Sequence, residues 1–328
     1  MRRRNSGIVL RVLAGACVAI FAIGVLIYGL ATGFGLKELR RFGFQRDFTV
    51  PYEYTEEVDE LTDIDISWLA GPVTLSFYNG PDIRVVEIAQ QELSESEQLS
   101  LSISRNTLEI RWNSSLFNLF GFWHSEAKSL EVQIPRQFAY GLETVRVSTS
   151  SGDIVMDDLT VEKAVFETVS GELQVHNVAA EQVQLKTTSG DIVAENVAGI
   201  KKFTASTVSG EAKMTDIQAG ELEFGTTSGD LVFRGTAEEF KGSAVSGELD
   251  VTLENWPGET KLESVSGDVA FRAPSSPEGF TCKFKTVSGD FQSGFATQKS
   301  GDTYICGAGT FDVKINTTSG DVTLIPSA

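Results

Sequence analysis

From Leu61 to the C-terminus, apolar and polar residues alternate along the chain, and this pattern predicts β-strands throughout. The stretch "DIDISW" places Ile64, Ile66 and Trp68 on one face of a strand, and residues 73–77 repeat the pattern. Successive side chains of a strand point to opposite faces, so alternation of this kind is typical of strands that are buried on one side. Turn residues separate the alternating runs. The sequence therefore predicts an all-β fold.

A five-residue pattern containing Ser-Gly-Asp or Ser-Gly-Glu occurs nine times between residues 149 and 321. Its glycines are Gly152, Gly171, Gly190, Gly210, Gly229, Gly247, Gly267, Gly289 and Gly320. Most intervals between successive motif glycines are 18 to 22 residues, and the last is 31. A fixed period of this kind predicts a β-solenoid of about 19–20 residues per coil, in which each coil contacts its neighbours.

The columns of the repeat predict which residues face the interior of the solenoid. Positions seven and five before the motif glycine, and two and four after it, are mostly apolar. We expect two short strands per coil to meet at a glycine corner, where glycine permits a tight turn and Ser and Asp bind backbone groups. Six residues after the glycine, Asp158, Asn177, Asn196 and Asp216 suit a second corner with left-handed backbone.

The repeat divides the chain into regions. Residues 148–328 form the regular coils, and residues 61–147 are expected to be irregular opening coils that cap the array. Gly71 lacks the Ser-Gly-Asp motif but has apolar residues at the same four positions around it, namely Ile64, Ile66, Val73 and Leu75. A further Ser-Gly-Asp at residues 300–302 fits a hairpin bulging from one coil better than a tenth coil.

The N-terminus predicts a membrane anchor. Residues 12–31 carry no charge and follow a basic start, and twenty helical residues span the roughly 30 Å of a hydrocarbon core. We interpret residues 1–35 as a cytoplasmic stub and a single-pass transmembrane signal anchor, followed by a linker at 36–60. Cleavage after Ala31 and a lipoprotein box around Cys17 are alternatives. The body is then expected on the extracytoplasmic side of the cell membrane.

The charge of the chain narrows the classes of partner. The net charge is −18, and the first 47 residues hold eight Lys or Arg against only two Asp or Glu. An acidic body repels polyanions, so nucleic acid is discounted as a partner. The expected partners are the membrane of its own anchor and an envelope protein or a wall or glycan ligand.

The repeated "TVSGD" and "TTSGD" motifs, the "SLEVQIP" stretch at Ser129–Pro135 and the N-terminal anchor resemble a known bacterial family. These are the β-strand-repeat envelope proteins grouped as candidate adhesins, whose shared domain is a domain of unknown function. The resemblance covers roughly Leu61 to the C-terminus. It implies a β-solenoid held at the cell envelope, and some similar proteins are linked to envelope-stress signalling. It implies no catalytic residues.

The acidic residue after each motif glycine is the first candidate site. Stacked carboxylates would repel, and Ca²⁺ would offset that repulsion at Asp153, Asp191, Asp230 and Asp268. Ca²⁺ prefers six to eight oxygen ligands, however, and one carboxylate per coil is sparse. We therefore favour hydrogen-bonded turn residues, and we expect no cofactor.

Two other features are candidates for interaction or cross-linking. The aromatic stretch at residues 116–124 either folds over the open end of the solenoid as a cap or docks on a partner or membrane. We favour the cap. The apolar residues of this stretch include Leu116, Phe117, Phe120, Phe122 and Trp123. Cys282 and Cys306 are the candidates for a disulfide in an extracytoplasmic body.

Catalysis has little support in the sequence. The two histidines, His124 and His176, are far apart, and no nucleophile elbow, P-loop or metal-spaced Cys/His set is present. We therefore expect a non-catalytic, adhesin-like binding or structural module. The alternative is an accessory regulator of a membrane envelope-stress sensing system, which would contact a sensor through the membrane-proximal region and the aromatic stretch. A glycan-acting hydrolase is a remote alternative.

Overall fold

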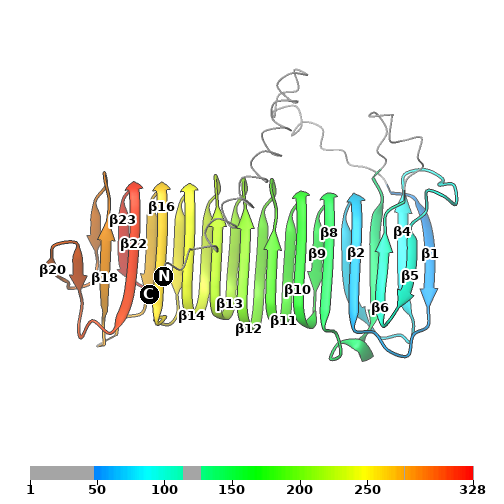
Figure 1. Ribbon diagram of the computed structural model, residues 1–328, viewed down its shortest axis with the longest axis horizontal. Helices are drawn as coiled ribbons and strands as arrows, with labels where there is room; N and C mark the ends of the chain where they lie inside the picture. Colours follow the sequence, from blue (N-terminus) through cyan, green and yellow to red (C-terminus); the bar gives the residue numbers. More distant parts are fainter. Residues whose placement is uncertain (1–47, 114–126, 277, 328) are drawn as a thin grey trace, which may run out of the picture. The chain divides into compact units, whose positions relative to one another are not determined.

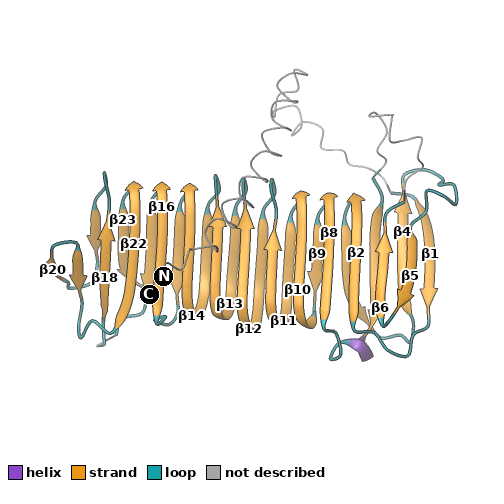
Figure 2. Ribbon diagram, in the orientation of Figure 1, coloured by secondary structure: helices purple, strands orange, loops and turns teal. Residues whose placement is uncertain are grey.

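The computed structural model describes residues 48–113, 127–276 and 278–327, which belong to one compact unit beginning at Phe48. Figures 1 and 2 show this unit as a row of strands standing side by side. The described segments include no helix that is both long and apolar enough to cross a membrane. The predicted anchor at 1–35 and the first part of the predicted linker lie outside the described residues.

Each coil consists of a strand that enters the motif corner and a strand that leaves it. We call the two resulting faces the leading face and the trailing face. Strands of the leading face are β2 (Asp63–Ala70), β6 (Thr107–Arg111), β8 (Thr144–Ser151), β10 (Thr160–Ser170), β16 (Glu259–Ser266), β18 (Phe280–Lys285) and β22 (Phe311–Ser319). Strands of the trailing face are β3 (Val73–Tyr78), β7 (Ser129–Pro135), β9 (Ile154–Asp157), β15 (Leu249–Leu253), β17 (Val269–Ala273), β19 (Phe291–Ser293) and β23 (Val322–Pro326).

Four longer strands pass around the second corner and contribute to both faces. They are β11 (Leu173–Lys186), β12 (Ile192–Thr207), β13 (Ala212–Thr226) and β14 (Leu231–Ser246). Their neighbours pair in parallel, one repeat apart, so that Phe166 lies beside Leu185, Leu185 beside Ala205 and Ala205 beside Phe224. All four side chains of this column are buried. The all-β class and the predicted interior columns are confirmed.

The second corner adopts the backbone conformation that the sequence predicts. Asp158, Asn177, Asn196 and Asp216 have φ values of 59°, 54°, 54° and 55°. Asn and Asp tolerate this left-handed region better than most residues. The side chains also form a ladder between coils, because Asn196 Nδ2 donates to Asn177 Oδ1 at 2.7 Å and Asn177 Nδ2 donates to Asp157 Oδ1 at 3.0 Å.

The order of the coils at both ends of the stack departs from the order of the sequence. Strand β2 pairs with both β6 and β8, so the second coil of the chain lies outside the first. At the other end, β22 pairs with both β16 and β18, which places the last coil between two earlier ones. The sequence did not predict this order, and Gly71 occupies the motif column beside Gly152, as the column positions predict.

Antiparallel strands extend the sheet at both ends. At one end, β1 (Val50–Glu56) pairs with β4 (Ile83–Ala89), β4 pairs with β7, and β5 (Ser100–Ser104) pairs with β6. Because β1 falls within the predicted linker, the end of that segment is a strand and not a linker. It forms because Tyr52 and Tyr54 alternate with exposed residues and half-bury against the body. A short 3-10 helix, η2 (Arg136–Phe138), follows β7.

At the other end, a hairpin joins β20 (Gln298–Ser300) to β21 (Thr303–Ile305). Its turn contains Gly301 with a φ of 61°, and β21 pairs antiparallel with β18. The prediction that residues 300–302 belong to a hairpin bulging from a coil is confirmed.

Candidate functional site

The motif glycines stack on one another along the corner, and this contact explains why the motif needs glycine. A Cβ atom on Gly190 would lie 1.8 Å from the carbonyl oxygen of Gly171, and one on Gly171 would lie 2.1 Å from that of Gly152. The predicted reason was a tight turn. The structure adds a second reason, because these glycines also admit the backbone of the neighbouring coil.

Five of the motif aspartates accept a hydrogen bond from the backbone of the neighbouring coil. Asp153 Oδ1 accepts a hydrogen bond from the Glu172 backbone N–H at 2.9 Å, and Asp191 Oδ1 accepts one from Glu211 at 2.8 Å. The same bond links Asp230 with Glu248, Asp268 with Asp321 and Asp321 with Asp290. Aspartate has a shorter side chain than glutamate, which suits a hydrogen bond to a nearby backbone N–H. The expected role of Asp as a hydrogen-bonding turn residue agrees with these contacts.

The residue three positions before the motif glycine forms a second ladder inside the corner. Thr168, Thr187 and Thr207 each donate a hydrogen bond to a glycine carbonyl of the preceding coil, at 3.2–3.3 Å. These threonines are buried. The hydroxyl therefore pairs a carbonyl that the corner would otherwise leave without a partner.

Exposed apolar side chains recur along the outside of the same corner, with serine or threonine at this position in several of the coils between them. Seven large hydrophobic side chains are strongly exposed in the described segments, and five of them stand two positions before the motif glycine or its equivalent. We call this row the corner ridge, and its members are Leu69, Val169, Val245, Val265 and Val287. Exposed apolar rows of this kind mark interaction surfaces more often than isolated apolar residues do.

A groove of about 340 Å³ lies beside the corner ridge on the leading face. Val245, Val265 and Thr318 form one wall, and Ser243, Glu263 and Asn316 are on the other. The carboxylate of Glu263 contacts Lys261 Nζ at 2.8 Å and accepts a hydrogen bond from Asn316 Nδ2 at 3.4 Å. The groove thus combines aliphatic side chains with hydroxyl, amide and charge-paired carboxylate groups.

A second groove, of about 620 Å³, lies at the opposite corner and includes Trp256, Glu221 and Glu259. Hydrogen bonds from Lys202 to Glu221 and from Lys314 to Glu259 lower the pKa of both carboxyl groups. The Trp256 ring stacks on Phe311 with centroids 5.5 Å apart, and its Nε1 donates to the Pro274 carbonyl at 2.7 Å. These contacts assign the groove residues mainly to packing and ion pairing.

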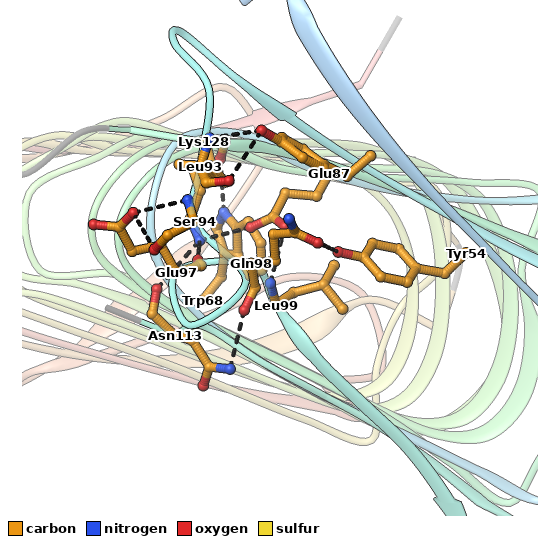
Figure 3. A network of polar contacts seen from close by, with 11 residues as sticks. Tyr54, Trp68, Glu87, Leu93, Ser94, Glu97, Gln98, Leu99, Asn113 and Lys128 are labelled. Atoms are coloured by element: carbon orange, nitrogen blue, oxygen red, sulfur yellow. Dashed lines mark hydrogen bonds and ion pairs between the residues drawn. The ribbon is translucent and has the colours of Figure 1, made fainter. Parts of the chain in front are cut away.

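A buried ion pair lies at the end of the stack that contains β4 and β7 (Figure 3). Lys128 Nζ is 2.6 Å from Glu87 Oε1, and the two side chains are 2% and 0% exposed. The ammonium group also donates to the carbonyls of Glu97 and Asn113, at 2.7 and 3.3 Å, and lies 4.1 Å from the Trp112 ring centroid. This arrangement pairs a buried charge and satisfies its hydrogen bonds, as burial requires.

The same network reaches the edge strands β1 and β5 (Figure 3). Glu87 Oε2 accepts hydrogen bonds from the Leu99 backbone N–H at 2.9 Å and from the Tyr54 hydroxyl at 3.5 Å. Burial and the nearby Glu87 charge raise the pKa of Tyr54 to about 12. Sequence reasoning missed this network. The available signal was Glu87, which occupies an inward position between Val85 and Ala89 where an apolar residue is expected.

The other predicted sites have different outcomes. The aromatic stretch at residues 116–124 lies outside the described residues. His176 Nδ1 is 3.7 Å from Glu195 Oε2 on the surface of the stack. In the described ranges, no group of three or more His, Cys, Asp or Glu residues is spaced to hold a metal ion. Ca²⁺ binding at Asp153, Asp191, Asp230 and Asp268 stays the less favoured, untested alternative.

Cys282 and Cys306 are free thiols in the structure. Cys282 faces Tyr304 across the β18–β21 pair, whereas Cys306 faces Phe280, so the two cysteines are diagonal neighbours. Diagonal positions are about 7–8 Å apart, which exceeds the Cα separation usual for a disulfide. Burial raises the pKa of the Cys282 thiol to about 12.

Iodoacetamide is therefore expected to modify Cys306 in the folded protein and to leave Cys282 unmodified, because only the thiolate reacts. Peptide mass spectrometry after alkylation in native buffer measures both sites, and alkylation in denaturant is the control in which both react. Resistance of both cysteines until a reductant is added would instead support the bridge.

Comparisons with known proteins agree with the fold. The family model described as Toastrack DUF4097 matches residues 61–325. A solved structure of a candidate adhesin from Parabacteroides distasonis has a TM-score of 0.53 and 12% identity, and the match covers 84% of this chain and 98% of that one. A candidate lipid-binding protein from the same organism has a TM-score of 0.53 and 14% identity, covering 84% and 96%. No curated protein matches the chain.

Proposed function

This chain belongs to the Toastrack DUF4097 family, and we propose that it is a membrane-anchored, adhesin-like binding module of the cell envelope. Its body is a β-solenoid on the extracytoplasmic side, held by the N-terminal signal anchor. The module is non-catalytic and binds a linear ligand such as a wall polymer or glycan along its surface.

The corner ridge is the observation that carries this proposal. Within it, Val245 and Val265 lie in register on neighbouring strands, since Ala244, next to Val245, pairs with Ser264, next to Val265. Neighbouring strands are about 4.8 Å apart, so this pair of valines and the groove beside it offer a short aliphatic surface for a segment of a polymer. Aliphatic side chains on one wall and hydroxyl, amide and carboxylate groups on the other complement a sugar ring, which has apolar C–H groups and polar edges.

The motif carboxylates support a structural role over a catalytic one. Paired carboxylates of glycoside hydrolases need different environments, one to hold a proton and one to stay ionised. Here Asp153, Asp191 and Asp230 share one environment and one hydrogen-bond partner type.

An accessory role beside a membrane sensor is the second candidate, and the buried network favours it. Lys128 Nζ contacts the carbonyl of Asn113, so the residues on either side of the aromatic stretch are held together. In this candidate, the membrane-proximal region and the aromatic stretch at 116–124 would contact the sensor.

Replacing Val245 and Val265 together by Asp is expected to weaken ligand binding at least tenfold, because it places two charges on the aliphatic wall of the groove. Binding of the purified full-length protein in detergent micelles is measured on a glycan array and by co-sedimentation with cell-wall polysaccharide. The control replaces Val193 and Val232 by Asp, because these half-exposed residues point outward from the trailing face.

Equal binding by the two double variants and the parent chain would contradict the role of the ridge. Loss of binding in both variants, with a lowered melting temperature, would assign the effect to folding. Binding to phospholipid vesicles in place of polysaccharide would point to the lipid class named for one solved relative.

A further inference from the structure

Four lysines form a single row across the leading face, on the strands near the C-terminal end of the stack. Lys241 on β14 pairs in register with Lys261 on β16. Lys314 on β22 lies in register between Lys261 and Lys283, which belongs to β18. Figure 1 shows these four strands side by side. Neighbouring strands are about 4.8 Å apart, so the four ammonium groups follow the axis of the stack. We call these four residues the lysine row.

The repeat does not require lysine at this position. On the preceding strands β10, β11, β12 and β13, the same register position holds Val165, Gln184, Thr204 and Glu223. Like charges directly opposite each other destabilise a sheet, so a row of lysines does not serve the stacking of the coils. A contact with a molecule outside the chain explains the row better than folding does.

The lysine row runs beside the groove of the corner ridge. The polar wall of that groove contains Ser243, Glu263 and Asn316, and each stands two positions after a lysine of the row on the same strand. Side chains two positions apart on a strand point to the same side. Lys261 Nζ lies 2.8 Å from Glu263 Oε2, so this ammonium group is at the edge of the groove. With increasing distance from the corner, the face therefore carries an aliphatic, a polar and a cationic band.

The charges of the lysine row are accessible to a ligand. Three of the lysines form ion pairs with carboxylates at 2.6–3.3 Å, namely Lys241 with Glu221 and Glu239, Lys261 with Glu263, and Lys314 with Glu259. All of these side chains are 33–53% exposed, and solvent screens such pairs, so each pair contributes little to stability. Lys283 and Lys285 are exposed and form no ion pair within the described ranges.

We propose that the ligand of this groove is an acidic glycan, a linear polymer of sugar units with carboxylate or phosphate groups along one edge. The proposal rests on the proposed function and names the chemical class of its ligand. The sugar rings would lie against Val245 and Val265, and the anionic groups would face the lysine row.

The narrow width of the cationic band favours a glycan of this kind over a ligand that is charged on all sides. Beyond the lysine row, Glu239, Glu259 and Asp312 share the next outward register position on β14, β16 and β22. A ligand charged on all sides would meet this acidic band, whereas anionic groups on one edge would not. The net charge of −18 repels anions at a distance, but physiological salt screens that repulsion beyond roughly 8 Å. The nearest charges therefore govern the contact.

A matched pair of polymers tests the requirement for charge. Polygalacturonate carries a carboxylate on each sugar, and its methyl ester has the same backbone without the charge. Full-length protein in detergent micelles should bind immobilised polygalacturonate at least about tenfold more tightly than the ester at low salt, and high salt should remove the difference. Polyphosphate in the same assay distinguishes phosphate from carboxylate as the recognised group.

Variants of the lysine row locate the contact. Lys261→Gln combined with Lys283→Gln should weaken polygalacturonate binding about tenfold and leave ester binding unchanged, whereas arginine at both positions should preserve both. The control combines Lys163→Gln with Lys213→Gln, which changes the net charge equally at exposed positions outside the row. Glu263→Gln should strengthen polygalacturonate binding, because it removes a carboxylate from the groove wall and releases Lys261.

The outcomes separate this proposal from the proposed function. Equal binding of polygalacturonate and its ester would overturn the acidic class of ligand, and so would equal losses in the two double lysine variants. Binding of polyphosphate alone, with the same dependence on the lysine row, would support an anionic ligand and identify phosphate as its charged group. Val245→Asp combined with Val265→Asp should weaken binding of both polymers. If those variants bind both polymers as the parent chain does, the proposed function fails, whatever the lysine variants show.

Discussion

Gly190→Ala is expected to lower the free energy of unfolding by about 3 kcal/mol or more, because an inserted methyl group has no room between two coils. Its Cβ would lie 1.8 Å from the Gly171 carbonyl oxygen and 2.6 Å from the carbonyl carbon. Both are backbone atoms in a paired strand region, so they cannot turn aside as a flexible side chain would. Urea unfolding, followed by circular dichroism, measures the change.

Gly225→Ala is the matched control, because this glycine also lies in a coil but beside open space. Its Cβ would meet Ser243 Oγ at 3.5 Å, which is an ordinary contact. Alanine should therefore leave stability unchanged or raise it slightly, since glycine has the greater conformational entropy when unfolded. Equal unfolding midpoints for the two variants would show that the motif glycines are not needed for close approach between coils.

Interactions between adjacent coils also predict which strands Gly190→Ala destabilises most. In a repeat array, stability comes from each unit and from its interfaces with its neighbours. Hydrogen exchange should therefore increase most in β11 and β12, which lie on either side of the Gly190 corner, and less in β3 and β7.

The repeat itself could be predicted from the sequence because its columns are local and periodic. Inward positions such as Phe166, Leu185 and Phe224 are apolar at a fixed distance from the motif glycine, and they are buried in the structure. The left-handed corner at Asn177 and Asn196 could be predicted for the same reason, since few residue types tolerate that backbone conformation.

The order of the end coils could not be predicted, because the motif is nearly the same in every coil. Asp268 accepts the N–H of Asp321, and Asp321 accepts that of Asp290, so the last coil fits between two earlier ones without any change of motif. Stacking contacts of this type are interchangeable between coils. At the C-terminal end, the sign of irregularity was the long interval before Gly320, and the hairpin at Gly301 accounted for part of it.

The buried network was missed because its two charges are far apart in the sequence. Glu87 and Lys128 are separated by 41 positions, and although Glu87 stands at an inward position of β4, nothing in the sequence identifies Lys128 as its partner. Only the pairing of β4 with β7 brings these strands together, and that pairing is antiparallel, unlike the repeats. The ligand of the corner ridge is likewise not encoded in the repeat, because the exposed valines of a stacked array need only be compatible with the corner.

Lys128→Met is expected to lower the free energy of unfolding by about 3–5 kcal/mol, because it leaves the Glu87 carboxylate buried without its counter-ion. The pair is fully buried, and the ammonium group also satisfies the carbonyls of Glu97 and Asn113. Glu87→Leu alone should lower the free energy of unfolding by a similar amount, because it leaves the Lys128 ammonium group buried without its counter-ion. The double variant should lose much less free energy of unfolding than the two single variants lose together, since it removes both charges.

The matched control for this double-mutant cycle is the Lys314–Glu259 pair, which has the same 2.6 Å nitrogen–oxygen distance but side chains 42% and 41% exposed. Lys314→Met should change stability by about 1 kcal/mol or less, because solvent screens an exposed pair. Urea unfolding of all variants at one pH and salt concentration gives both coupling energies. A coupling between Lys128 and Glu87 no larger than that between Lys314 and Glu259 would mean that burial does not determine the strength of the pair. The network would then not be what holds β1, β4 and β5 against the end of the stack.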